Sequence, residues 1–150
     1  CGLIYRIAAH CFECETAVRL LLDTHIALWA ITDSPKLGVL ARELILSPEN
    51  MVFVSAVSLW EIAIKHALSA QGRGDMPVTA SRAAELFAAA GYESLAVSWA
   101  HSVAISALPQ QPAHADPFDR MLIAQARSEA MTLLTRDTDV AAYGERVMRV

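Results

Sequence analysis

The sequence predicts an α/β fold in which helices cover both faces of a central parallel sheet. Short apolar segments such as "RLLL" (19–22) and "MVFVS" (51–55) alternate with longer segments of helical period. Strands that alternate with helices typically pair in parallel, because each crossover helix returns the chain to the same edge of the sheet. With 150 residues, 55% of them hydrophobic, the chain can bury one core, and no repeat or linker divides it.

The first part of the chain differs from the rest. We expect residues 1–18 to be an N-terminal extension, non-native or disordered, and residues 19–150 to form a single domain. Residues 1–17 would then precede a native start at Val18. Cys11 and Cys14 have the C-x-x-C spacing of half a zinc site, but no second pair of ligands follows. All three cysteines lie within the first fourteen residues, so a disulfide framework is excluded and a cytoplasmic location is expected. Charged residues interrupt every apolar run before it reaches the length of a membrane span.

The first half of the domain contains two strand patterns and three helix patterns. "RLLLD" is a buried strand that ends abruptly in an acid, and Ser34-Pro35 has the form of an N-cap followed by a proline in the first helical position. The elements expected in order are a strand over 19–23, a helix over 24–31, a helix from Ser34-Pro35 to about Ser47-Pro48, a strand over 51–55 and a helix over 56–70.

The second half continues the alternation after a polar loop. "QGRGDMPVT" (71–79) is the clearest loop, and a second loop surrounds Pro109 and Pro112. The elements expected are a helix over 80–90 stopped by Gly91, a short strand over 94–97, a helix over 99–107, a helix that opens at Asp116-Pro117, and a last clear strand over 131–135.

Acidic residues recur at one edge of this predicted sheet. Asp23 follows the first strand, and Asp137 and Asp139 follow the last one. Glu61 and Asp119 lie in helices that begin at the same edge. Ligands of parallel α/β sheets bind outside the carboxyl ends of the strands, so four separate segments could direct carboxylates toward one place.

Each acid taken singly also has an ordinary structural explanation. These are a helix cap for Asp23, a capping box with Ser58 or a surface ion pair with Lys65 for Glu61, an N-cap for Asp116 with Asp119 in the third helical position, and a turn for Asp137. None of these explanations accounts for the recurrence of acids at one edge of the sheet and their lack at the opposite edge.

Clustered carboxylates repel one another and need a compensating cation or proton, and oxygen-only ligands favour Mg²⁺ or Mn²⁺ over zinc. The chemistry that this supports is phosphodiester hydrolysis, in which a metal activates water and neutralises charge on the phosphate. The net charge of −4, from 12 basic against 16 acidic residues, excludes a globally cationic surface. Phosphates of an RNA outside the site would therefore need local cations, for which Lys65, Arg73, Arg120 and Arg136 are candidates.

From about Arg19 to Val150 the chain resembles the PIN-domain family, in particular the VapC-type toxins of bacterial type II toxin–antitoxin pairs. The segments that carry the resemblance are "LLLDTHIALWAI", "VSAVSLWEIAIKHAL", "HADPFDRMLIAQA" and "LLTRDTDVAAYG". The resemblance implies a three-layer α/β/α fold with a parallel sheet of about five strands. It also implies a magnesium-dependent endoribonuclease, usually a homodimer, that a cognate antitoxin protein holds inactive.

The resemblance also assigns residues. By motif match the four acids of the family, which would hold one or two metal ions, are Asp23, Glu61, Asp119 and Asp137. Thr24 and Thr135 match small hydroxyl residues that support the site, Asp116 is a supporting or capping residue, and Asp139 is the alternative to Asp137 as fourth acid. Lys65, Arg120 and Arg136 are the basic residues nearest to these motifs, and we expect them to contact the substrate.

The histidines and tryptophans give weaker evidence of a functional site than the acids do. The five histidines are scattered, so no Ser-His-Asp or Cys-His arrangement competes with the acids, and His114 is more simply a loop residue than an RNA contact. Trp29 and Trp60 lie in apolar helical patterns, which favours a place in the core or a dimer interface over base stacking.

Two alternative functions stay open. A catalytically inactive PIN-like module would bind RNA without cleaving it, although all four acid positions are filled. A receiver-type phospho-switch would need an acid pair after the first strand and a lysine after the last, whereas the chain has Asp23-Thr24 and no such lysine.

Overall fold

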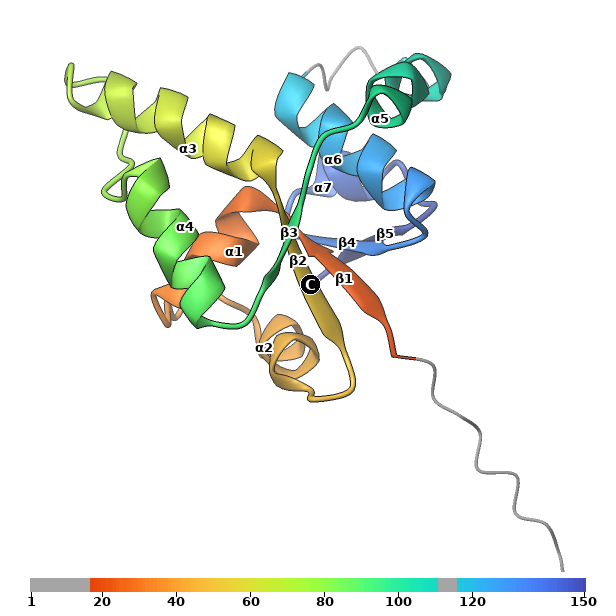
Figure 1. Cartoon of the computed structure of the whole chain (residues 1–150), viewed down its shortest axis with the longest axis horizontal. Coiled ribbons are helices and arrows are strands. Elements are labelled where there is room, and N and C mark those ends of the chain that lie inside the picture. Colours follow the sequence, from red (N-terminus) through yellow and green to blue (C-terminus); the bar gives the residue numbers. More distant parts are fainter. Residues whose placement is uncertain (1–16, 111–115) are drawn as a thin grey trace, which may run out of the picture.

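In the computed structural model of the chain, residues 17–110 and 116–150 are described. They contain one five-stranded parallel sheet in the order β3-β2-β1-β4-β5 (Figure 1). Its strands are β1 (Arg19–Leu22), β2 (Met51–Ser55), β3 (Glu93–Leu95), β4 (Thr132–Thr135) and β5 (Val147–Arg149). The predicted fold class is therefore confirmed. The predicted N-terminal extension, its cysteines and His114 fall largely or wholly outside the described residues.

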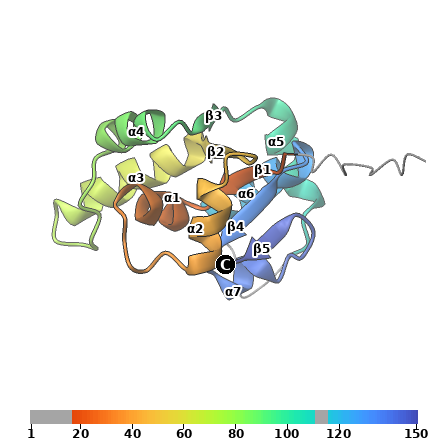
Figure 2. The same ribbon diagram turned by 90° about the horizontal axis from the view of Figure 1, so that it is seen from below.

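The helices cover both faces of this sheet. They are α1 (Thr24–Ile31), α2 (Val39–Leu46), α3 (Ala56–Ser69), α4 (Ala80–Ala89), α5 (Trp99–Ala104), the 3₁₀ helix η1 (Ile105–Ala107), α6 (Pro117–Ser128) and α7 (Thr138–Ala141). Figures 1 and 2 show α1, α2 and α4 on one side of the sheet and α5, α6 and α7 on the other. No helix in the described part of the chain is long and apolar enough to cross a membrane.

The central strand β1 shows why the sheet is buried on both faces. Leu20 and Leu22 pack in the core on the side of α1, α2 and α4, whereas Leu21 packs in the core formed with α6. This alternation follows from the two-residue period of a strand. A strand with both faces covered must be apolar throughout, which is why "RLLL" was readable as a strand. The first polar residue after these leucines is Asp23, which directly follows the end of β1.

The second predicted helix begins later than expected. Ser34-Pro35 does not start it: Ser34 accepts from the Lys36 N–H with its hydroxyl at 3.2 Å and from the Leu37 N–H with its carbonyl at 3.1 Å. These bonds close a turn that carries Leu37 into the core, where it is 6% exposed. Helix α2 therefore begins at Val39. The helix start predicted from Ser34-Pro35 is wrong because these residues form a turn that buries the Leu37 side chain.

The end of the chain contains elements that no pattern predicted. Helix α7 has four residues and β5 has three, both too short to show a period. The predicted helix over 99–107 is divided into α5 and η1. The fifth strand nevertheless completes the number that the family resemblance implied.

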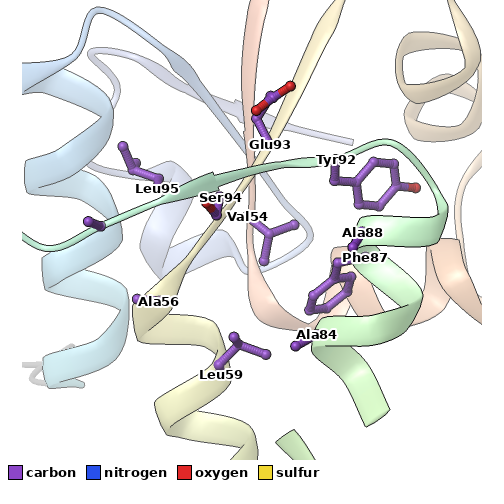
Figure 3. A pocket seen from close by; sticks show the side chains of 11 residues that line it. Val54, Ala56, Leu59, Ala84, Phe87, Ala88, Tyr92, Glu93, Ser94 and Leu95 are labelled. Atoms are coloured by element: carbon purple, nitrogen blue, oxygen red, sulfur yellow. The ribbon is translucent and has the colours of Figure 1, made fainter. Parts of the chain in front are cut away.

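An apolar hollow of about 390 Å³ lies between α3, α4 and the β2–β3 edge of the sheet. Figure 3 shows Val54, Leu59 and Phe87 around it, with Tyr92 at its border. None of its lining residues is among the predicted site residues.

Candidate functional site

A second hollow, of about 430 Å³, opens at the carboxyl edge of the sheet, where β1 and β4 end and α1 begins. It is lined by Asp23, His25, Trp29, Glu61, Lys65, Asp116, Asp119, Arg136 and Asp137. Four distant segments of the chain thus contribute acids to one place. Asp139, the alternative fourth acid, is not among the lining residues.

Asp23 lies directly after β1, and only 7% of it is exposed. Its N–H donates to the carbonyl of Leu134 at 3.0 Å, which extends the pairing of β1 with β4 by one residue. Its Oδ2 accepts from the hydroxyl of Thr135 at 2.7 Å. Asp23 occupies the N-cap position of α1, as the ordinary explanation expected, but its side chain makes no capping hydrogen bond there.

Glu61 lies in the second turn of α3 and is 4% exposed. The Thr24 hydroxyl donates to Glu61 Oε2 at 2.5 Å and lies 3.0 Å from Ser58 Oγ. The capping box with Ser58 is wrong, because α3 begins earlier and Ser55 caps it by accepting from the Val57 N–H at 3.1 Å. Ser58 instead lies within the first turn of α3, where its buried hydroxyl is hydrogen-bonded to that of Thr24.

The helix α6 places two acids at its start. Asp116 is its N-cap, as the sequence predicted, and its Oδ1 accepts from the N–H groups of Phe118 and Asp119 at 2.8 and 3.2 Å. Pro117 occupies the first turn, where its lack of an N–H costs no hydrogen bond. Asp119 follows in the same turn, half-buried and facing the hollow.

Asp137 is the N-cap of α7 rather than a turn residue. Its Oδ1 accepts from the N–H groups of Asp139 and Val140 at 2.7 and 3.3 Å. Its own N–H donates to Thr135 Oγ1 at 3.0 Å. The Thr135 hydroxyl therefore connects Asp23 with the backbone of Asp137.

The profile of the PIN domain family matches residues 20–146, which is most of the chain. The chain belongs to the PIN domain family. The four acids of this PIN domain lie within the matched range. No curated protein matches the sequence.

Solved structures share the fold at low identity. The VapBC2 complex from Rickettsia felis, solved with a DNA fragment of its promoter, contains a chain with TM-score 0.62 and 17% identity, over 89% of this PIN domain and 98% of that chain. DNA-bound VapBC from Salmonella typhimurium gives 0.61 and 16%, over 88% and 98%. VapC20 from Mycobacterium tuberculosis, a toxin that cleaves the sarcin–ricin loop, gives 0.56 and 20%, over 83% and 95%.

The electrostatics of the PIN domain site centre on Lys65. Its ammonium donates to Glu61 Oε1, as the i,i+4 spacing predicted, although Glu61 is buried and not on the surface. Partial burial lowers the pKa of Lys65, but the hydrogen bond to Glu61 and the charges of Glu61, Asp116 and Asp119 outweigh it and raise the pKa overall. Lys65 therefore stays cationic and offsets part of the negative charge.

Burial has the largest influence on the pKa of Asp23. Burial raises its pKa above the usual value, and the charge of Glu61 adds to the rise. The Thr135 hydrogen bond, the next largest influence, and His25 act in the opposite direction. A carboxylate whose ionised form is disfavoured in this way gains from a bound cation.

In the part of the chain that the structure describes, no three His, Cys, Asp or Glu side chains lie close enough together to hold a metal ion as they stand. The donor chemistry nonetheless fits a hard divalent cation, because the acids of the hollow offer only carboxylate oxygens. Asp23 and Glu61 are both buried, and the charge of Glu61 raises the pKa of Asp23. A cation at this place would relieve the repulsion between them.

Some residues differ from expectation. Arg120 does not line the hollow: its guanidinium donates to the carbonyl of Pro109 at 3.0 Å and to the Tyr143 hydroxyl at 2.8 Å. Arg73 is exposed in the loop after α3 and is also absent from the lining. Arg136 does line it, beside Asp137.

Sequence reasoning missed His25 and Trp29 as site residues and placed Trp29 in the core or an interface. Trp29 does pack partly against the core, but it also lines the hollow with His25. The two are four residues apart on α1, directly after Asp23. This i,i+4 spacing behind a strand-end acid was the signal that could have found them.

Proposed function

We propose that this protein is a metal-dependent endoribonuclease that cleaves RNA phosphodiester bonds at Asp23, Glu61, Asp119 and Asp137. The observation that carries the proposal is the burial of two acids, Asp23 and Glu61, in one hollow with the two others. Burying ionisable acids side by side costs stability. A fold that retains such a pair is expected to use it, and membership of the PIN domain family supports a nuclease.

The four acids would hold one or two Mg²⁺ ions, or Mn²⁺, since hard oxygen ligands suit these cations. When bound, the cation supplies activation of a water molecule and neutralisation of charge at the phosphate. The chain's own residues set the positions: Thr135 orients Asp23, and Thr24 orients Glu61. Lys65 holds Glu61 and, with Arg136, gives the hollow two cationic groups for phosphate oxygens.

The direct test is incubation of the purified protein with structured RNAs, with Mg²⁺ and with EDTA. Cleavage is expected only with the metal, and is expected to disappear in an Asp23→Asn and Asp119→Asn double variant. Asp139→Asn, outside the hollow, is the matched control and should cleave normally. Cleavage that persists in EDTA or in the double variant would contradict the metal site. Binding of RNA without cleavage would leave the inactive RNA-binding module.

We further propose that the protein is a VapC-type toxin with a cognate antitoxin, acting in the cytoplasm. The similarity to chains of VapBC complexes supports such a partner, and the absence of cysteine after residue 14 supports the location. Expression of the chain alone should arrest growth. Coexpression of the small protein encoded beside it should restore growth and yield a complex on purification. Arrest that also occurs with the Asp23→Asn and Asp119→Asn double variant would contradict a toxin that acts by cleavage.

A homodimer is the assembly that we propose. The helices α3 and α5 both contact α6 and expose large apolar side chains: Trp60 (59%), Ile64 (39%), Trp99 (93%) and Val103 (72%). Such side chains usually mark an interaction surface when they gather on neighbouring helices. Light scattering should give twice the chain mass, and Trp99→Asp with Val103→Asp should give a folded monomer. A wild-type monomer at high concentration would exclude the homodimer.

A further inference from the structure

Besides the acids and Lys65, three side chains line the hollow: His25, Trp29 and Arg136. The rings of His25 and Trp29 lie with centroids 5.9 Å apart at an angle of 46°. The guanidinium carbon of Arg136 lies 5.6 Å from the centroid of the Trp29 ring. We call these three residues the rim cluster.

The rim cluster is held in place from two sides. Trp29 is half-buried and packs against the core beneath α1, so its indole is anchored in the fold. Arg136 is exposed, but its Nη1 donates to the carbonyl of Lys36 at 2.7 Å, which fixes the guanidinium beside the indole. An exposed cation–π contact stabilises a folded protein only weakly, so stability alone gives little reason to arrange these groups at the hollow.

The rim cluster is also tied to the acids by sequence. His25 comes two residues after Asp23, and Arg136 comes directly before Asp137. A phosphate placed at the acids would therefore bring the nucleoside attached to it next to the rim cluster. Aromatic faces and guanidinium planes are the groups on which proteins stack unpaired bases.

We propose that His25, Trp29 and Arg136 form a binding site for one unpaired nucleobase adjacent to the phosphate that is cleaved. This inference rests on the proposed RNA-cleaving function and names a contact within it. The base stacks against the indole of Trp29. Arg136 contributes a planar guanidinium next to the base and a positive charge near the phosphate. The site selects for a base that is free to leave its helix, whatever its identity.

A fluorescence experiment tests stacking without any cleavage. Trp60→Phe and Trp99→Phe leave Trp29 as the sole tryptophan, and both replaced residues are exposed. In this background, with Asp119→Asn to prevent cleavage, a six-nucleotide oligouridylate or oligoadenylate should quench Trp29. An abasic ribose-phosphate oligomer of equal length should not. Equal quenching by the base-containing and the abasic oligomers would overturn the proposal. RNA binding that anisotropy detects without quenching of Trp29 would overturn it as well.

A kinetic experiment tests the same cluster in the active protein. Arg136→Gln and Trp29→Leu should each raise KM for RNA by roughly tenfold with a smaller change in kcat, and Trp29→Phe should retain most of the affinity. Arg82→Gln, in a surface ion pair on α4, is the matched control. The effect of Trp29→Leu should vanish with a substrate that is abasic at the stacked position.

The two variants guard against a folding artefact, because Trp29 is half-buried whereas Arg136 is exposed. Unchanged KM in both, with normal cleavage, would overturn the base site and leave the proposed function intact. If the wild-type protein cleaves no RNA, the proposed function fails, and the quenching experiment alone decides whether the rim cluster binds a base.

Discussion

Four of the five acids that line the hollow fall into two groups with different surroundings. The inner acids, Asp23 and Glu61, are buried and are each held by a threonine hydroxyl. The outer acids Asp116 and Asp137 are exposed, and each caps a helix with its own side chain. Burial of the inner acids therefore lowers the stability of the fold, whereas the outer acids raise it by capping helices. We infer that only the inner pair is kept at a cost in stability.

The largest expected effect is on cleavage by Asp23→Asn. Loss of this inner carboxylate should reduce kcat by about a thousandfold, since metal-dependent charge stabilisation contributes several kcal/mol. Rates would be measured on one RNA with Mg²⁺ in excess. Asp116→Asn keeps the cap of α6 and should reduce kcat far less. An equal reduction in the two variants would contradict the distinction between inner and outer acids.

The next effect concerns the hydroxyl that holds Glu61. Thr24→Val removes the donor while retaining the shape, and a hydrogen bond to a buried charge contributes about 2 kcal/mol. The free energy of unfolding in urea should fall by that amount. Thr32→Val, which removes an exposed hydroxyl at the other end of the same helix, should change it by only a few tenths of a kcal/mol. Equal losses in the two variants would show that the hydrogen bond from Thr24 to the buried Glu61 carboxylate does not stabilise the fold.

Lys65 sharpens the comparison because it pairs with an inner acid and lies near the outer ones. Lys65→Met should tighten Mn²⁺ binding roughly tenfold, since the ammonium and the metal ion compete for Glu61 and repel each other. Calorimetry of metal binding measures this without any substrate. Arg82→Gln removes a distant surface cation and should leave the affinity unchanged. Weaker binding in Lys65→Met would mean that the lysine organises the site rather than competing with the metal.

The inner acids also predict a pH dependence of stability. Because the pKa of Asp23 is raised in the folded protein, the unfolded chain ionises first as the pH rises above about 4. Unfolding then becomes easier until the folded carboxyl has ionised as well. In metal-free buffer, Asp23→Asn should match the wild type in unfolding free energy near pH 3 and be the more stable of the two at neutral pH. A wild-type protein that is the more stable at neutral pH would contradict the raised pKa.

The smallest effect is expected at an outer acid. Asp116→Ala removes two hydrogen bonds at the start of α6 and should cost about 0.5–1 kcal/mol of unfolding free energy. Asp116→Asn keeps a capping oxygen and should cost almost nothing. Denaturant titration of the two variants separates the cap from the charge. Equal losses would assign the contribution of Asp116 to its charge.

Much of this arrangement could be predicted from the sequence. The strands around Asp23 and Thr135 are apolar runs that end abruptly, so the acids that follow them had to meet at one edge of the sheet. The start of α6 was also predictable, because the cap at Asp116 is a local property of Asp-Pro.

The rest depends on contacts between distant segments. Ser34-Pro35 resembled a helix start, but the burial of Leu37 moved that start to Val39. The short β5 has no period to detect and is defined by its pairing with β4. The role of Trp29 at the hollow depends on Arg136, which is more than one hundred residues away.

The Thr135 hydroxyl restricts how this protein can change in evolution. It donates to the first acid and accepts from the backbone of the fourth, so one oxygen atom sets both positions. Substitutions at residues 23 and 135 are therefore not independent, and their effects are expected to be epistatic. Serine is the one other residue that offers the same small hydroxyl. A lineage that loses this hydroxyl alters two corners of the site in a single step.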